Sequence, residues 1–220
     1  MPSRGINRVL WIAALLAIII LGFKTRDRFD ILFARVGTLT VSEEPERGAV
    51  IMRWNGMIEA PMARRIAEVF AEKRATAKVF ILSLSSPGGT LNQGAEVARL
   101  LRTIGETHRL ETIVESGGRC ASMCVPVYLQ GQHRTAAPDA AFMFHEVSFW
   151  EFESNDELKV PQSARAAETD RLFQRYFEPV DVPAAWIAKT RAEMAGGHDV
   201  WKTARELVAE NAGIVQELSD

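Results

Sequence analysis

The amino-acid sequence predicts an α/β fold in which a mainly parallel β-sheet is flanked by helices. From residue 49 onward, short runs of β-branched and aromatic residues alternate with amphipathic helical segments. The run "KVFILSLS" (residues 78–85) is almost continuously apolar, which is typical of a strand buried on both faces of a parallel sheet. In such sheets, functional sites lie at the carboxyl ends of the strands. Candidate functional residues are therefore expected where these strands end.

The individual elements follow from periodicity. In the first predicted helix, for example, Met62, Ile66, Val69 and Phe70 fall on one face, with charged residues opposite. The predicted strands are residues 49–58, 78–85, 110–116 and 140–147; the predicted helices are 60–75, 92–106, 120–130, 163–177 and 183–195, followed by a helix, a turn and an apolar run over 203–215.

Composition indicates one globular domain with appendages. The chain has 220 residues, 47% of them hydrophobic, and a formal net charge of -2. It can therefore bury a sizeable core, and nothing in its charge suggests a nucleic-acid surface. We expect an N-terminal membrane anchor or signal segment over 1–23, a linker over 24–48, and the α/β domain over 49–220.

Residues 9–23 form an uncharged apolar run between Arg8 and Lys24. As a helix this run is about 22 Å long, shorter than the roughly 30 Å hydrocarbon core, although snorkelling of the flanking side chains extends its reach. The run ends Gly-Phe-Lys-Thr-Arg, without the small residues of a cleavage site, which favours an uncleaved anchor. A cleaved signal peptide is the alternative.

Two strands are followed by glycine pairs, Gly88-Gly89 and Gly117-Gly118. The second pair leads to Ser122, expected at or just inside the start of the helix over 120–130, where unpaired N–H groups stabilise developing negative charge. His145 stands near the end of a strand and has the side chain most often used as the base for a serine nucleophile. The ordinary alternatives are a capping serine and a buried core histidine.

Three stretches in this order, "SSPGGTLNQG", "CASMC" and "AFMFHEV", resemble the proteolytic subunit of the Clp protease family, within the crotonase-like superfamily. The resemblance implies that fold and a serine peptidase. By matching position, it implies that Ser122 is the nucleophile, that His145 is the general base, and that the N–H groups of Gly89 and Met123 form the oxyanion hole.

The third member in that family is an aspartate that precedes an aromatic residue and a Ser/Thr-Ala-x-Glu helix start. Asp199 stands in this position in "HDVWKTARELVAE", so the resemblance assigns it to orient the histidine. Its spacing from His145 is several residues longer than in the family, and helix capping is the alternative role. Asp181 and Asp170 are weaker candidates.

The two cysteines, Cys120 and Cys124, flank Ser122 and form a candidate disulfide; two buried thiols are the alternative. Cys120 is an alternative nucleophile, although Ser122 fits the motif better. The pair also resembles periplasmic Clp-like proteins. That resemblance implies a single-pass protein of the bacterial inner membrane with a periplasmic domain, or a secreted periplasmic protein.

No metal is expected, because the four histidines are scattered and one Cys-x3-Cys lacks a second pair of ligands. The expected reaction requires no nucleotide or organic cofactor. The expected partners are a peptide or protein substrate, the membrane through the N-terminal segment, and further copies of the chain. A membrane-directed segment replaces the axial-loop region of the cytosolic subunits, which argues against an unfolding ATPase as partner. Nucleic acid is not expected.

The expected activity is peptide-bond hydrolysis through an acyl-enzyme. Two alternatives stay open. A catalytically inactive binding or scaffold protein would explain the longer "SGGRC" loop and the altered aspartate spacing. An acyl-CoA enzyme would share the fold and the oxyanion hole, but it would not explain a Ser-His pair.

Overall fold

The computed structural model describes residues 37–149 and 158–219. The segment predicted as a membrane anchor or signal, residues 1–23, lies outside the described residues, as does the first part of the predicted linker. Within the described ranges, none of the helices combines the length and the apolar character needed to span a membrane.

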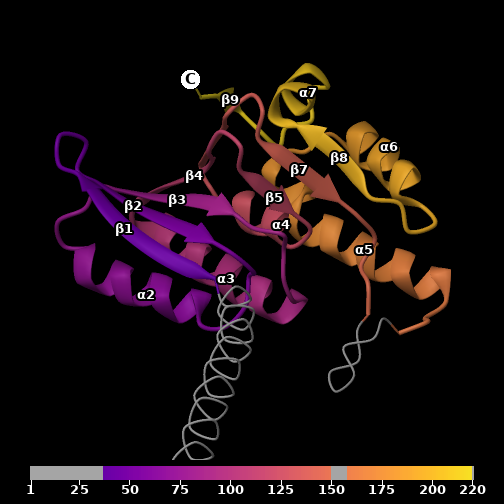
Figure 1. The fold of residues 1–220 in the computed structure, drawn as a ribbon, viewed down its shortest axis with the longest axis horizontal. Helices are drawn as coiled ribbons and strands as arrows, with labels where there is room; N and C mark the ends of the chain where they lie inside the picture. The colour runs from indigo at the N-terminus through magenta and orange to yellow at the C-terminus, as the bar shows by residue number, and fades with distance from the viewer. Residues whose placement is uncertain (1–36, 150–157, 220) are drawn as a thin grey trace, which may run out of the picture. The chain divides into compact units, whose positions relative to one another are not determined.

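The larger of two sheets has six strands in the order β1-β2-β3-β4-β6-β9 (Figure 1). Strands β1 and β2 are antiparallel, and every other neighbouring pair is parallel. The bounds are β1 Thr38–Glu44, β2 Ala49–Asn55, β3 Val79–Ser85, β4 Arg109–Val114, β6 His133–Ala136 and β9 Glu217–Leu218. The apolar run over 78–85 is the buried strand β3, as its sequence predicts.

The smaller sheet has three strands in the order β5-β7-β8: β5 Arg119–Ala121, β7 Ala141–Phe144 and β8 Val200–Thr203. Strands β5 and β7 are parallel, whereas β7 and β8 are antiparallel. A single bridge between Ser86 and Cys120 links the end of β3 to this sheet. The carboxyl ends of a strand from each sheet therefore lie close together.

Helices α2 and α3 lie beside each other along the larger sheet, and α6 packs on β8 (Figure 1). The buried face of α2 contains Met62 and Ile66, two of the residues that periodicity places there. The helix bounds are α2 Met62–Lys73, α3 Leu91–Thr107, α4 Cys124–Tyr128, α5 Gln162–Tyr176, α6 Ala184–Met194 and α7 Ala204–Ala209, with a 3₁₀ turn η1 at Glu178–Val180.

The α/β class is confirmed, with a mixed arrangement of strands, and strand β1 is a short element within the segment 24–48. Two local expectations need correction. Strands β6, β8 and β9 were not expected. The helix predicted over 120–130 is a strand, a turn and the short helix α4. Cys120 pairs with Phe142 and bridges Ser86, so backbone pairing on both sides holds residues 119–121 in extended form.

Candidate active site

Ser122 lies in the turn between β5 and α4, two residues before the helix begins. Its φ of 54° is in the left-handed region, which a non-glycine residue adopts at a cost of about 1 to 3 kcal/mol. Two backbone hydrogen bonds hold it there: its N–H donates to the Met143 carbonyl (2.9 Å), and its own carbonyl accepts from the Val125 N–H (3.0 Å). A strained, doubly anchored turn thus sets the direction of the hydroxyl.

His145 follows strand β7 directly, and its Nε2 lies 2.7 Å from Ser122 Oγ. The strands explain this contact, because parallel pairing of β5 and β7 aligns Ala121 with Met143. The serine and the histidine are then each carried just beyond the end of neighbouring strands. When the Nε2 atom is unprotonated it accepts the hydroxyl proton, which is the arrangement of a serine with its general base.

The Ser-Pro-Gly-Gly turn needs its glycines for contacts within the protein. A Cβ on Gly88, whose φ is 108°, would lie 2.7 Å from Ser122 Cβ and 3.2 Å from its hydroxyl oxygen. A Cβ on Gly89 would collide with the backbone of Ile58, to which it is bridged. The Ser86 hydroxyl accepts a hydrogen bond from the Gly88 N–H (3.1 Å) and so fixes the turn. The close packing of this turn on Ser122 therefore excludes side chains.

Two backbone N–H groups near Ser122 have no acceptor among the described residues, those of Gly89 and Met123. Gly89 follows the glycine that touches Ser122, and Met123 follows Ser122 itself. The Met123 side chain packs onto helix α3 at Gly94, where a Cβ would overlap it, and this contact anchors the residue. These are the two amides that the resemblance to the Clp protease family assigns to an oxyanion hole.

Asp199 directly precedes β8. The antiparallel pairing of β7 and β8 ends with Phe144 opposite Val200, so one step further along each strand are His145 and Asp199. The Asp199 side chain is exposed. In the described part of the chain, no hydrogen bond joins its carboxylate to the imidazole. The register thus brings the two residues to neighbouring positions without forming the third contact of a triad.

The weaker aspartate candidates have other environments. Asp170, on α5, forms an ion pair with Arg191 of α6. Asp181 ends the 3₁₀ turn in a left-handed conformation with φ of 61°. Of the three aspartates, Asp199 is the one that the strand register aligns with His145.

Strand β8 is held by a partly buried cluster of charged and polar side chains that sequence reasoning missed. The Glu210 carboxylate accepts hydrogen bonds from Lys202 Nζ (2.8 Å), Trp186 Nε1 (2.9 Å) and Lys189 Nζ (3.1 Å). Burial alone would raise the pKa of Glu210, but these three donors outweigh it and lower the pKa to about 2. The cluster links β8 to helix α6, and it thereby also holds the backbone at Asp199, which directly precedes Val200. No spacing signal in the sequence marks it.

Sequence reasoning also did not identify Asp139, whose side chain stabilises the loop between β4 and β5. Its Oδ2 accepts from Ser116 Oγ and from the Gly117 N–H, both at 3.0 Å. These two hydrogen bonds hold the pKa of the Asp139 carboxyl below its ordinary value. The loop between β4 and β5 is thus fixed at its first turn.

Cys120 and Cys124 are joined by a disulfide bond, with their Cα atoms 5.1 Å apart. Cys120 belongs to β5 and Cys124 begins α4, so the bond spans the Ser122 turn. Both cysteines are fully buried. With its sulfur in this bond, Cys120 has no thiolate to act as a nucleophile.

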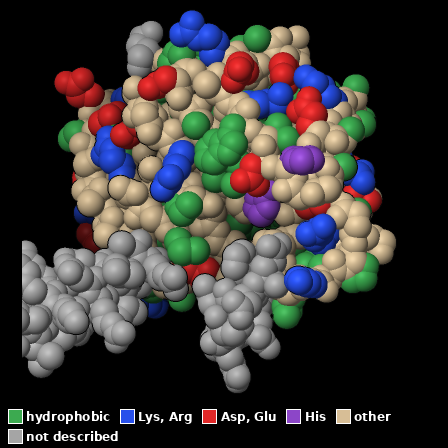
Figure 2. Space-filling view, turned by 45° about the vertical axis from the view of Figure 1, so that its right-hand side comes forward, with side chains coloured by type: hydrophobic (Ala, Val, Ile, Leu, Met, Phe, Trp, Pro, Cys, Tyr) green, Lys and Arg blue, Asp and Glu red, His purple; other side chains and the backbone are tan. Residues whose placement is uncertain are grey.

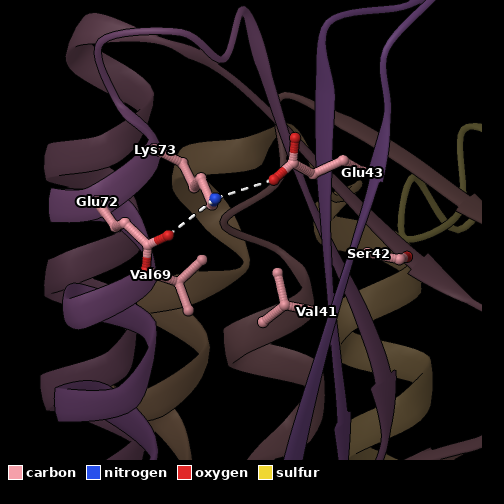
Figure 3. Close-up of a pocket in the computed structure, with 6 residues that line it drawn as sticks. All are labelled: Val41, Ser42, Glu43, Val69, Glu72 and Lys73. Carbon is pink, nitrogen blue, oxygen red and sulfur yellow. Dashed lines mark ion pairs between the residues drawn. The ribbon is translucent and has the colours of Figure 1, made fainter.

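A hollow of about 480 Å³ lies between β1 and α2, and none of the candidate catalytic residues lines it (Figure 3). The Lys73 ammonium there donates to Glu72 (2.8 Å) and Glu43 (2.9 Å), and these carboxylates raise the pKa of Lys73. A lysine held in its charged form by two carboxylates does not act as a base, so the hollow shows no catalytic chemistry. Its lining residues are Val41, Ser42, Glu43, Val69, Glu72 and Lys73.

Figure 2 brings the side with α5, α6 and β8 forward and shows histidine, acidic and hydrophobic side chains next to one another. On β8, Trp201 is 52% exposed and lies opposite Met143 of β7. An exposed aromatic ring therefore stands two residues from Asp199 on the same face of the strand.

Within residues 37–149 and 158–219, no group of three histidine, cysteine or acidic side chains could hold a metal ion.

The sequence profile described as Clp protease matches residues 48–219, a stretch that contains the glycine turn, Ser122, His145 and Asp199. The chain belongs to the Clp protease family. This membership agrees with the strand-end position of the Ser122–His145 pair and with the glycine turn packed against it, and it supports a peptidase.

Solved structures of the same fold share little sequence with this Clp family member. A ClpP1 point mutant from Listeria monocytogenes has a TM-score of 0.57 and 17% identity, covering 80% of this chain and 93% of that chain. A point mutant of the membrane-bound stomatin-specific protease 1510-N has a TM-score of 0.57 and 12% identity, covering 78% of this chain and 77% of that chain. At these identities the likeness shows the fold alone. Among curated protein sequences, none matches.

Proposed function

We propose that this protein is a serine-type peptidase that hydrolyses peptide bonds through an acyl-enzyme. The observation that carries the proposal is the 2.7 Å contact between Ser122 Oγ and His145 Nε2, formed at a strained turn. A left-handed non-glycine residue at a chemically active side chain is a conformation that proteins retain mainly where function requires it. Membership of the Clp protease family supports the same reaction.

In the proposed mechanism, Ser122 Oγ attacks the carbonyl carbon of the scissile bond and its proton passes to His145 Nε2. The bond between carbon and nitrogen then breaks, and His145 returns the proton to the leaving amine. Water, deprotonated by the same imidazole, hydrolyses the ester on Ser122. The free N–H groups of Gly89 and Met123 donate to the oxyanion in both steps. The reaction requires no metal, nucleotide or organic cofactor.

Asp199 is assigned the orienting role, as the residue whose carboxylate accepts a hydrogen bond from the Nδ1–H of His145. The strand register supports this assignment, because it places the two residues opposite each other beyond the last pair of β7 and β8. Catalytic hydrogen bonds are often longer in the unbound form and tighten with substrate. The exposed Asp199 carboxylate has the freedom to make this movement.

The second candidate is a binding or scaffold protein that keeps the fold without turnover. One observation favours it: Asp199 and His145 share no hydrogen bond in the described part of the chain. A serine and a histidine without an orienting carboxylate would react slowly.

We also propose that the domain works outside the cytoplasm, attached to the bacterial inner membrane through residues 9–23 or secreted to the periplasm. The buried disulfide between Cys120 and Cys124 supports an oxidising compartment. The substrate is a peptide or protein, and the chain assembles with further copies of itself. An unfolding ATPase is not part of this proposal.

Reaction with a fluorophosphonate probe tests the proposed function. Wild-type protein should form a covalent adduct on Ser122, identified by mass spectrometry of the labelled peptide, and Ser122→Ala should not. Ser163→Ala is the matched control, because Ser163 is an exposed serine on α5 far along the chain from the turn, and it should label like the wild type. Wild-type protein that is folded by circular dichroism and stays unlabelled would instead identify the scaffold.

A further inference from the structure

We infer that the Cys120–Cys124 disulfide is a positioning brace for the nucleophile: it holds Ser122 in its left-handed conformation and keeps the Met123 N–H in place. This inference rests on the proposed function, which supplies the roles of Ser122 and Met123. It assigns the disulfide no contact with substrate and no redox step in the reaction.

The connectivity provides the first support. The ring closed by the disulfide contains three residues between the cysteines, and two of them are Ser122 and Met123. Each end of the ring is fixed by regular structure. Cys120 is paired with β7 and bridged to Ser86, whereas Cys124 is the first residue of helix α4. The disulfide therefore links two fixed points across the turn that carries the hydroxyl.

The strain at Ser122 provides the second support. With φ of 54°, this residue has lower-energy conformations available, and a change to one of them would rotate its side chain and the following amide together. Among the described residues, two backbone hydrogen bonds and the contact of its hydroxyl with His145 oppose that change. The Gly88 backbone packs against the serine from the other side. The disulfide adds a covalent restraint that joins the two ends of the turn directly.

The position of the disulfide argues against two ordinary roles of such a bond, global stabilisation and exchange with external thiols. A disulfide that closes a ring this small removes little entropy from the unfolded chain, so it contributes little to global stability. Both sulfurs are also fully buried, so they are poorly placed to exchange with external thiols. What remains is a local effect on the residues inside the ring.

The first experiment compares oxidised wild type, wild type reduced with a phosphine in denaturant and refolded, reoxidised wild type, and the double variant Cys120→Ala/Cys124→Ala. The maximal rate of fluorophosphonate labelling and the probe concentration at half that rate are measured separately. We expect the maximal rate to fall about 10- to 100-fold in the reduced protein and in the double variant, since small misplacements of reacting groups have effects of this size. The half-saturating concentration should stay within a factor of about two.

Reoxidation should restore the maximal rate in the wild type and leave the double variant unchanged, which separates the bond from the packing of the two sulfurs. Equal maximal rates in oxidised and reduced wild type would overturn the brace. A loss of labelling that accompanies unfolding in circular dichroism would also overturn it, because the disulfide would then act on global stability.

A second measurement is independent of catalysis. Amide hydrogen exchange by mass spectrometry should become at least about tenfold faster in peptides covering residues 121–125 on reduction, while peptides from β3 stay unchanged. If oxidised wild type is not labelled but this local difference is present, the proposed function fails and the brace stands. If exchange at 121–125 is equal in both redox states, the brace fails whatever the labelling shows.

Discussion

The two sheets differ in what holds them and in what they carry. In the larger sheet, β1 to β4 have six or seven residues each, and side chains at its centre, such as Met52, Phe80 and Leu82, are fully buried. The smaller sheet has strands of three and four residues, and the residues just beyond their ends are Ser122, His145 and Asp199. Apolar burial in the larger sheet stabilises the fold, whereas the smaller sheet positions the candidate catalytic residues. Substitutions in the two sheets should therefore separate loss of folding from loss of activity.

This difference has a physical basis. A large sheet gains its free energy mainly from apolar burial, which depends little on the direction of any one side chain. The smaller sheet also buries Phe142 and Phe144, but individual contacts hold its short strands: a bridge to Ser86, a disulfide, and the Glu210 cluster on β8.

The largest effect should follow from Asp199→Asn in the smaller sheet. If Asp199 orients the imidazole, the rate of peptide cleavage should fall about 10³- to 10⁴-fold, or about 4 to 5.5 kcal/mol of transition-state stabilisation. The free energy of unfolding should change by less than about 0.5 kcal/mol, because the side chain is exposed. Steady-state kinetics on a peptide substrate, with denaturant unfolding of the same sample, measures both.

The matched control is Asp181→Asn. Asp181 is in a left-handed conformation that asparagine also tolerates, and it is not aligned with His145. It should leave the cleavage rate unchanged. Equal rates for wild type and Asp199→Asn would remove Asp199 from the site.

The next largest effect should follow from Leu82→Ala in the larger sheet. Leu82 is fully buried in β3, and truncating it leaves a cavity that should lower the free energy of unfolding by about 2 to 5 kcal/mol. Activity per folded molecule, measured by active-site titration, should stay within a factor of about two. Thr40→Ala on the exposed edge strand β1 should change neither quantity. A large loss of activity per folded Leu82→Ala molecule would contradict the separation of the two sheets.

The smallest effect should follow from Glu210→Gln, which weakens the attachment of β8. Because the folded pKa of Glu210, about 2, lies below its ordinary value, its ionised form stabilises the folded state above about pH 4.5, and this contribution is lost as the pH falls toward 2. The variant should be less stable by about 1 kcal/mol at pH 7, since a carboxylate with partly exposed partners loses charged hydrogen bonds. Melting curves at several pH values measure this.

Wild type and Glu210→Gln should converge in melting temperature at low pH. Glu96→Gln, an exposed glutamate on α3, is the control and should follow the wild type at every pH. A stability difference that does not shrink on acidification would mean that the carboxylate charge is not what holds β8.

Much of the candidate site could be predicted from the sequence, because its motifs are local. Ser122, His145 and the glycine turn were each identified from a few neighbouring residues, and the structure brings the serine and the histidine together. The predictions that failed concern elements whose sequence signal is overridden by tertiary contacts. Strand β6 was missed because it contains Arg134, a buried charge whose guanidinium donates to the carbonyl oxygens of Ile214, Gly131 and Gly213.

Other features have no local signal at all. Glu210 and Lys202 meet through α7 and β8, eight residues apart, and neither residue type nor spacing marks the contact. Asp139 reads as an ordinary turn residue, yet it fixes the loop before β5. The helix expected at 120–130 has suitable apolar residues. Its first residues instead form strand β5, because they pair with β7.

The sequence by itself determined the fold class, the apolar strand β3, the amphipathic helices and the candidate nucleophile and base, because periodicity and short motifs act over a few residues. Tertiary structure alone decided that Ser122 adopts a left-handed turn, that Gly88 packs against it, and that β8 aligns Asp199 with His145. These features depend on pairing between segments far apart in the chain, whose free energy is gained only when the whole domain has folded.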